Sequence, residues 1–284
     1  STLFAHKAWK RAFALGGVGL LLVGAAACSS SDKKSDDSAG TTAPAATSTT
    51  AAKPAADATL HILVSNDDGY NADGIDALVQ DLRKLPHVAI TVVAPLTNQS
   101  GQGGNTTPGQ LAVTKVKTKS GYPATAVAGH PADAVRVALD DMKLKPDVVI
   151  TGINLGQNLG PVINVSGTVG AARAAATRGI PALATSAGFP NTVYAPALPF
   201  IEKWIAQHRA ALVAHAMAAN VDNLNVPSCA TGQVRGEVTV KPAPAGVVVN
   251  TDPAGCESTA TGQPNDSAAF SAGFATMSRI PNRP

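Results

Sequence analysis

Between residues 60 and 186, short runs rich in β-branched residues alternate with stretches of helical pattern. The strand-like runs are Leu60 to Ser65, Val88 to Pro95, Asp147 to Gly152 and Pro181 to Ser186. The helical stretches are Gly74 to Leu85, Pro131 to Met142, Ser166 to Arg178 and, further on, Ala197 to Ala219. This alternation is typical of α/β domains whose parallel strands are joined by crossover helices. We therefore expect an α/β fold with a mostly parallel sheet.

Weaker patterns predict further strands. They are Leu111 to Val116, Ala124 to Gly129, Asn223 to Val226, the sequences VTVKP and GVVVN between residues 238 and 250, and Phe274 to Pro281. The stretch from Thr251 to Asp266 is rich in Gly, Pro and Thr, which indicates a loop whose turn types the sequence does not specify.

The first 27 residues have the pattern of a secretory signal peptide. Its basic residues are Lys7, Lys10 and Arg11, and residues 12–27 form an apolar run of 16 residues. A membrane-spanning helix needs about 20 residues, so the run fits a signal peptide better than a span. Small residues directly before Cys28 resemble a bacterial lipobox, which predicts that Cys28 is lipidated. Ala25 departs from the usual Leu or Val, which leaves ordinary cleavage in the same stretch as the alternative.

Residues 28–58 form a spacer of Ser, Thr, Ala and Pro without a large apolar residue. Such a segment cannot bury apolar surface and is predicted to be disordered. The expected organisation is a signal peptide at 1–27, a linker at 28–58 and a folded domain at 59–284, held by lipid on the extracytoplasmic face of the cell membrane. Beyond residue 27 there are 19 basic and 19 acidic residues. Binding to a nucleic-acid duplex through bulk charge is therefore not expected.

If Cys28 carries a lipid, Cys229 and Cys256 remain as a pair. Outside the cytoplasm an even pair of cysteines favours a disulfide, and two free thiols are the alternative. No C-x-x-C spacing accompanies them, so the sequence gives no indication of a zinc site.

Three of the predicted strands are followed by clusters of oxygen-bearing side chains. The clusters are Asn66 to Tyr70, Asn98 to Gly101 and Ile153 to Asn158. Adjacent carboxylates at the end of a buried strand, here Asp67 and Asp68, repel each other unless a cation or a shifted pKa compensates. Taken alone, Asp-Asp-Gly is a common turn sequence. Because all three clusters fall at the carboxyl edge of the predicted sheet, a hard divalent cation with carboxylate, amide and hydroxyl ligands is favoured.

Residues 164–170 lead into an Ala-rich helix and predict an anion site. The start of a helix presents free backbone N–H groups and a positive dipole end. Ser166 alone would be read as an N-cap. Beside a divalent cation, however, the same geometry would hold a phosphate group.

Five ordered motifs resemble those of the survival protein SurE family of metal-dependent 5′/3′-nucleotidases and phosphatases. They are SNDDGYNADGIDAL, VVAPLTNQSG, GHPADAVRVAL, PDVVITGINLGQNLG and VSGTVGAARAAATRGIPALATS. The resemblance implies a Rossmann-like three-layer sandwich and a Mg²⁺ or Mn²⁺ cofactor. The metal-ligand positions it implies are Asp67, Asp68, Ser100 and Asn154. The phosphate-contacting positions it implies are Asn158, Ser166, Gly167 and Thr168.

The resemblance also implies a homo-oligomer in which a β-hairpin and a C-terminal segment are exchanged between subunits. The tail after Pro227 is shorter than in the family and contains cysteines. Three further positions depart from the family pattern: His130 stands in place of Thr, Val165 in place of Tyr, and Ala174 in place of Glu. None of them removes a metal ligand. His130 is interpreted as a loop substitution rather than a catalytic base.

The sequence thus predicts a divalent-metal-dependent phosphomonoesterase acting on nucleoside monophosphates or similar small phosphate esters. Asp67 and Asp68 are the candidate catalytic residues, and Asp67 could act as a base or as a nucleophile. The alternative from another class is a non-catalytic lipoprotein that binds a phosphorylated ligand on the same scaffold, because a fold alone does not establish turnover.

Overall fold

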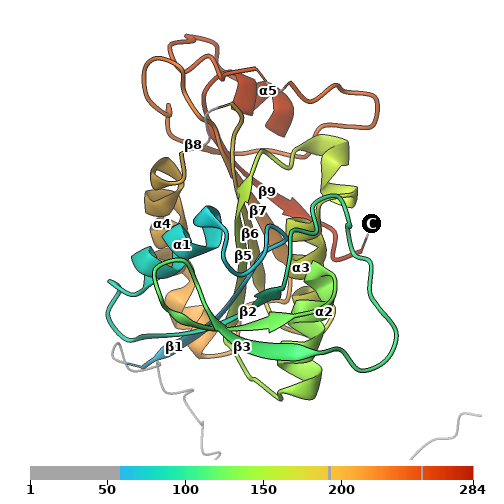
Figure 1. Cartoon of the computed structure of the whole chain (residues 1–284). Helices are drawn as coiled ribbons and strands as arrows, with labels where there is room; N and C mark the ends of the chain where they lie inside the picture. Colours follow the sequence, from blue (N-terminus) through green and yellow to red (C-terminus); the bar gives the residue numbers. More distant parts are fainter. Residues whose placement is uncertain (1–57, 191–192, 251, 284) are drawn as a thin grey trace, which may run out of the picture. The chain divides into compact units, whose positions relative to one another are not determined.

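The computed structural model describes residues 58–190, 193–250 and 252–283 (Figure 1). The predicted signal peptide, Cys28 and the predicted linker up to residue 57 lie outside the described residues. Among the helices of the described part, none is long and apolar enough to cross a membrane.

The described chain forms one nine-stranded sheet with the strand order β3-β4-β2-β1-β5-β6-β7-β9-β8. Its strands are β1 (Leu60–Ser65), β2 (Val88–Pro95), β3 (Val113–Lys117), β4 (Pro123–Val127), β5 (Val148–Leu155), β6 (Ala182–Ala187), β7 (Val221–Val226), β8 (Glu237–Thr239) and β9 (Ala275–Ile280). The helices are α1 (Asp73–Leu82), α2 (Pro131–Arg136), α3 (Gly167–Ala176), α4 (Leu198–Val213) and α5 (Asp266–Ser271), with the short turns η1 (Val137–Asp141), η2 (Gly160–Asn164) and η3 (Ala195–Ala197).

Six neighbouring strands run parallel, from β4 through β2, β1, β5 and β6 to β7. Only β3 and β9 pair antiparallel with a neighbour, with β4 and β7 respectively. The carboxyl ends of the six parallel strands therefore meet at one edge. The segment between β7 and β9 lies over this edge, where it is drawn in orange and red (Figure 1).

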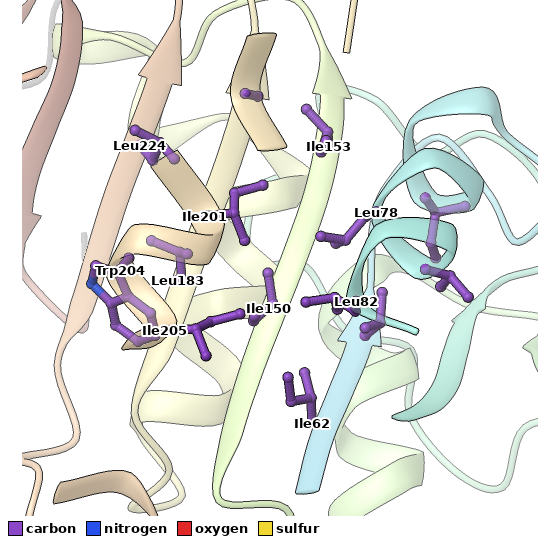
Figure 2. Packing of buried hydrophobic residues seen from close by; sticks show 14 of the residues in the cluster. Ile62, Leu78, Leu82, Ile150, Ile153, Leu183, Ile201, Trp204, Ile205 and Leu224 are labelled. Carbon is purple, nitrogen blue, oxygen red and sulfur yellow. The ribbon is translucent and has the colours of Figure 1, made fainter. Parts of the chain in front are cut away.

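Helices cover both faces of the sheet, and each face has its own apolar core. On one face α1 and α4 pack against β1, β5 and β6 through side chains such as Leu78, Ile150 and Ile201 (Figure 2). On the other face the small side chains of α3 let this helix lie close to the sheet together with α2. This is a three-layer α/β sandwich, which confirms the predicted fold class.

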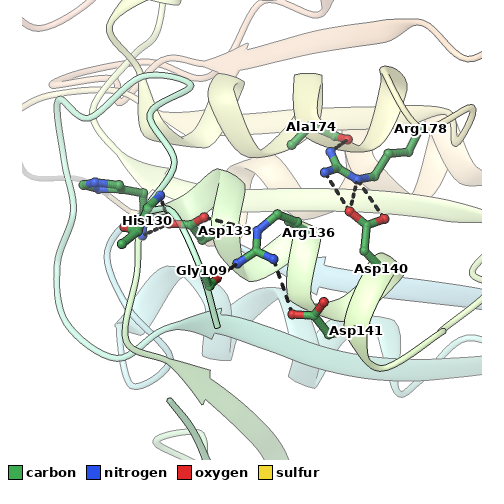
Figure 3. Close-up of polar contacts among 9 residues, drawn as sticks. Gly109, His130, Asp133, Arg136, Asp140, Asp141, Ala174 and Arg178 are labelled. Carbon is green, nitrogen blue, oxygen red and sulfur yellow. Dashed lines mark hydrogen bonds and ion pairs between the residues drawn. The ribbon is translucent and has the colours of Figure 1, made fainter. Parts of the chain in front are cut away.

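The predicted helix from Pro131 to Met142 is divided. It is α-helical only as far as Arg136 and ends in the wider turn η1. Here Asp140 binds the guanidinium group of Arg178 at 2.8 Å, and Arg178 also donates to the carbonyl oxygen of Ala174 (Figure 3). Arg178 thus has an acidic partner on η1, although Ala174 stands where the family resemblance has Glu.

The C-terminal segment differs in part from the prediction. The strand expected at 274–281 is present as β9, and VTVKP begins within β8. GVVVN, in contrast, was predicted as a strand and is irregular, so that prediction is wrong. The exposed fraction of Val248 is 87%, and β-branched residues favour a strand only where neighbouring side chains pack against them. Cys229 and Cys256 are joined by a disulfide.

Asp76 of α1 holds the hairpin between β3 and β4. Its carboxylate accepts hydrogen bonds from the Thr118 hydroxyl at 2.6 Å and from the Ser120 backbone N–H at 2.9 Å. Burial raises the pKa of Asp76, but the hydrogen bonds from Ser120 and Thr118 outweigh it and hold the pKa below its usual value. The charged form is therefore favoured by folding.

We expect Asp76→Asn to lower the free energy of unfolding at pH 7 by about 2 kcal/mol, the usual range for hydrogen bonds to a charged group. Because the pKa is lowered on folding, this contribution is present above about pH 4 and is lost as the pH falls through the folded-state value. Urea unfolding at pH 7 and pH 3.5 measures both effects. Asp73→Asn, on the same helix but exposed, is the control. A difference between variant and wild type that does not shrink at the lower pH would contradict this role.

Candidate functional site

The site begins at the turn after β1. The side chain of Asn66 forms two hydrogen bonds with the backbone of Gly69, and Gly69 has a φ of 102°, which a residue with a side chain rarely adopts. The turn directs Asp67 and Asp68 beyond the carboxyl edge of the sheet, where the sequence predicted them.

Asp67 is buried against the start of α3. The hydroxyl of Thr168 donates to its Oδ1 at 2.6 Å. Burial raises the pKa of Asp67, and hydrogen bonds from the Thr168 side chain and from the backbone N–H groups of Thr168 and Gly167 oppose this rise. The carboxylate therefore lies where the helix presents its positive end.

Asp68 is half-buried and lies between two other loops. Its Oδ2 accepts a hydrogen bond from the backbone N–H of Leu155, and its Oδ1 accepts one from the Asn98 side chain, both at 3.3 Å. Burial and the charge of Asp67 raise the pKa of Asp68 to about 6. Two neighbouring carboxylates whose pKa values are both raised form a site that a cation would stabilise.

Ser100 lies in the exposed loop after β2. This loop is tied to the turn after β1, because the backbone N–H of Gln99 donates to the carbonyl oxygen of Asp67 at 2.7 Å. Asn98 connects the loop to the second carboxylate. Its amide nitrogen donates to Asp68, and its amide oxygen accepts from the backbone N–H of Ser100 at 2.9 Å.

Asn154 is buried at the end of β5, opposite Ser186 of β6 in the strand register. Its side-chain nitrogen donates to the carbonyl oxygen of Gly156 at 2.7 Å. This contact leaves the amide oxygen available as an acceptor. The structure therefore brings the loops of all four predicted metal-ligand residues to one edge of the sheet.

Asn158 lies in a different hydrogen-bond network from the start of α3. Its side-chain nitrogen donates to the hydroxyl of Ser186 at 3.0 Å, and its backbone N–H donates to Asn225 at 2.6 Å. Its carbonyl oxygen accepts from Asn223 and Asn225. Its hydrogen bonds within the described chain thus fix the ends of β5, β6 and β7 and do not join Ser166, Gly167 or Thr168.

The start of α3 has the geometry of an anion site. Ser166 is the N-cap, and its hydroxyl accepts a hydrogen bond from the backbone N–H of Val169 at 3.2 Å. A Cβ atom added to Gly167 would lie 2.7 Å from the Cβ of Asp67, so only glycine allows the helix to approach this carboxylate so closely. The first backbone N–H groups of α3 and the carboxylates therefore face the same space.

The donor set fits a hard divalent cation. The described residues contain no cluster of three His, Cys, Asp or Glu side chains that could hold a metal ion. The predicted ligands include only two residues of those types, and the other two are a hydroxyl and an amide. Carboxylate, hydroxyl and amide oxygens are the ligands that Mg²⁺ and Mn²⁺ prefer.

Three groups at this site were missing from the predicted ligand set. Asn98 bridges Asp68 and Ser100, and its position two residues before the serine is a recognisable Asx-turn signal. The backbone N–H of Leu155 and the ring of Tyr194 have no such signal in the sequence. The ring of Tyr194 lies by Gly74, where an added Cβ would be 3.0 Å from its Cε1 atom, and burial and then the charge of Asp68 raise the pKa of Tyr194 to about 12.

Known proteins resemble this chain over the same region. A family model described as survival protein SurE matches residues 62–245. A 5′-nucleotidase SurE of Thermosipho melanesiensis is 39% identical over 180 residues, which cover 62% of this chain and 69% of that protein. Another, of Sorangium cellulosum, is 38% identical over 61% of this chain and 67% of its own length. The crystal structure of the SurE protein from Aquifex aeolicus superimposes with a TM-score of 0.63 at 26% identity, covering 78% of this chain and 93% of that one.

Proposed function

Because the chain belongs to the survival protein SurE family, we propose that it is a divalent-metal-dependent phosphomonoesterase that releases phosphate from nucleoside monophosphates or similar small phosphate esters. The relatives at 38 to 39% identity carry the name 5′-nucleotidase, which supports this activity. The single structural observation that carries the proposal is the position of Asp67, which accepts a hydrogen bond from Thr168 at the start of α3 and precedes Asp68 in the turn after β1.

Asp67, Asp68, Ser100 and Asn154 would hold the cation, which we propose to be Mg²⁺ or Mn²⁺. When bound, such an ion supplies charge neutralisation at phosphoryl oxygens and activation of the attacking group. The chain itself holds the phosphate. The backbone N–H groups and the positive dipole end at the start of α3 stabilise negative charge that develops at the phosphoryl oxygens, while the Thr168 hydroxyl donates its proton to Asp67.

Asp67 and Asp68 are the proposed catalytic residues. Asp67 is the residue placed to take a proton from an attacking water molecule or to attack phosphorus itself, because its carboxylate lies against the start of α3. In either role the Thr168 hydroxyl orients its Oδ1. Asn98 positions Asp68 and the backbone of Ser100 and is not proposed to contact substrate.

The proposed activity is tested by phosphate release. We expect the purified full chain to release phosphate from AMP over many turnovers with Mn²⁺ or Mg²⁺ and to stop when a chelator is added. A screen of nucleotides, polyphosphate and sugar phosphates identifies the preferred ester. Binding of phosphate without any turnover would instead support a non-catalytic protein that uses the same scaffold, an alternative motivated by Val165, an exposed residue in place of the family's Tyr.

We also propose that the protein is secreted and held on the extracytoplasmic face of the cell membrane by a lipid on Cys28. The apolar run and small residues before Cys28 support this. So does the disulfide between Cys229 and Cys256, since structural disulfides persist in oxidising compartments.

The anchor is tested by replacing Cys28. In the native host we expect the wild-type protein to sediment with membranes, and Cys28→Ser to appear in the soluble fraction. Mass spectrometry of the mature N-terminus gives the modification directly. Wild-type protein that is soluble and begins at an unmodified residue would contradict lipidation. A homo-oligomer stays a prediction, which gel filtration of the purified protein checks.

A further inference from the structure

Large apolar side chains are exposed around the carboxylates at the carboxyl edge of the sheet. They are Leu96, Leu155, Val165, Phe189 and Val193. Scattered exposed apolar residues are normal on any protein surface. Here, however, they lie in the loops that also form the site, and one of them is aromatic. An aromatic ring beside a phosphate site is a surface on which a flat ring of a substrate can stack.

Phe189 is held in place from several directions. It follows β6, and its ring lies against Gly156, where an added Cβ would come within 2.3 Å of the Phe189 Cε2 atom. Its backbone N–H donates to the side-chain oxygen of Gln157 at 2.9 Å, and the nitrogen of the same side chain donates to the carbonyl oxygen of Asn250 at 2.7 Å. The ring is thus fixed at Gly156, while 40% of the residue remains exposed.

The position of this ring relative to the carboxylates follows from the chain. Gly156 is the neighbour of Leu155, whose backbone N–H donates to Asp68 at 3.3 Å. Gly156, against which the ring packs, is therefore one Cα step of about 3.8 Å from the residue that holds the Asp68 carboxylate. The ring thus packs against the loop that holds Asp68.

A cavity of about 460 Å³ adjoins this part of the edge. It is lined mainly by apolar residues, among them Val193, Pro196, Phe200, Pro227, Ser228 and Val234. The Ser228 hydroxyl donates to the carbonyl oxygen of Gly188, the residue before Phe189, at 2.7 Å. The backbone just before Phe189 is therefore attached to the cavity wall, and the volume is within the range of small-molecule sites.

We propose that Phe189 is the platform on which the nucleobase of a nucleoside monophosphate stacks. This inference rests on the proposed phosphomonoesterase function and adds the residue that selects esters whose leaving group carries a flat ring. It predicts a preference for nucleotides over esters without a ring.

The test compares two esters and one ligand that is not hydrolysed. For Phe189→Ala we expect KM for AMP to rise at least about fivefold, from the loss of one base-aromatic stack, with kcat nearly unchanged because the lost interaction is uniform binding. KM for glycerol 2-phosphate should stay the same. The dissociation constant of adenosine, measured by calorimetry, should rise by the same factor as KM for AMP.

Matched variants separate stacking from other effects. Phe189→Tyr and Phe189→Trp should keep the wild-type values, whereas Phe189→Leu should behave like Phe189→Ala. Val113→Ala removes an exposed apolar side chain from the edge strand β3 and should change nothing. An unchanged KM for AMP in Phe189→Ala, or an equal rise for glycerol 2-phosphate, would overturn the inference. If the wild type hydrolyses no ester, the proposed function fails, but adenosine binding still tests the role of Phe189. Weaker binding of adenosine to Phe189→Ala than to the wild type would support this role, and any other result would overturn it.

Discussion

Asp67→Asn is expected to reduce metal-dependent phosphate release from nucleotides at least about a hundredfold, because it removes a negative charge from the proposed cation site and the candidate base or nucleophile together. The fold should survive. Asparagine has nearly the same shape, and its side-chain oxygen can still accept the hydrogen bond from Thr168. Initial rates with and without Mn²⁺, together with urea unfolding, measure the two effects separately.

The matched control is Asp141→Asn. Asp141 is a half-exposed carboxylate at the end of η1, where it pairs with Arg136 (Figure 3). It should keep full activity, because it contributes charge but lies outside the site. Full activity in Asp67→Asn would remove the proposed role of the carboxylates, whereas an unfolded variant would show that Asp67 is needed first for structure.

Gly170→Ala is expected to destabilise the protein by about 1 to 3 kcal/mol, the usual range for overpacking. Alanine is the better helix former by about 1 kcal/mol, so propensity alone predicts the opposite sign. The added Cβ, however, would lie 1.9 Å from the carbonyl oxygen of Gly103, and backbone cannot move aside as a side chain can. The loop after β2 must then leave the start of α3.

This substitution should also reduce activity, because the displaced loop carries Ser100. Gly103 is attached to the segment before α3 by a hydrogen bond from its backbone N–H to the carbonyl oxygen of Val165 at 2.9 Å. The neighbouring Gly104 is the control, since a Cβ there meets nothing within 4 Å. Urea unfolding and initial rates of Gly170→Ala and Gly104→Ala give the comparison. An equal free energy of unfolding for the two variants would show that the loop moves aside without loss of stability, and the prediction would be wrong.

Local patterns predicted most of the sheet. The runs at 60–65 and 88–95 are β1 and β2 with the same bounds, because buried parallel strands require continuous apolar, β-branched sequence. The strand predicted to end at Gly152 continues to Leu155, with a register shift between Thr151 and Asn154. This irregular continuation depends on pairing with β6, which no local pattern contains.

Long-range pairing explains what the sequence did not predict. β9 lies between β7 and β8 although it follows both in the chain. GVVVN has the residues of a strand but pairs with no strand of the described chain and leaves Val248 exposed. At the site, the Asp-Asp pair and the oxygen-rich loops correctly predicted that these residues lie at the carboxyl edge of the sheet. The backbone N–H of Leu155 was not predicted because a backbone donor does not depend on the residue type. The ring of Tyr194 was not predicted because the sequence does not show which loops approach each other in the fold.

We propose that Asp67 and Asp68 are tolerated side by side because they share a divalent cation with an incoming phosphate ester. Anomalous diffraction at the manganese edge, from crystals of the purified protein grown with Mn²⁺ and inorganic phosphate, tests it most directly. We predict one peak between these two carboxylates, with oxygens of Ser100 and Asn154 and of a phosphate beside the start of α3 as further ligands. A map without a peak there, in which Asp68 turns away from Asn154, would contradict the account.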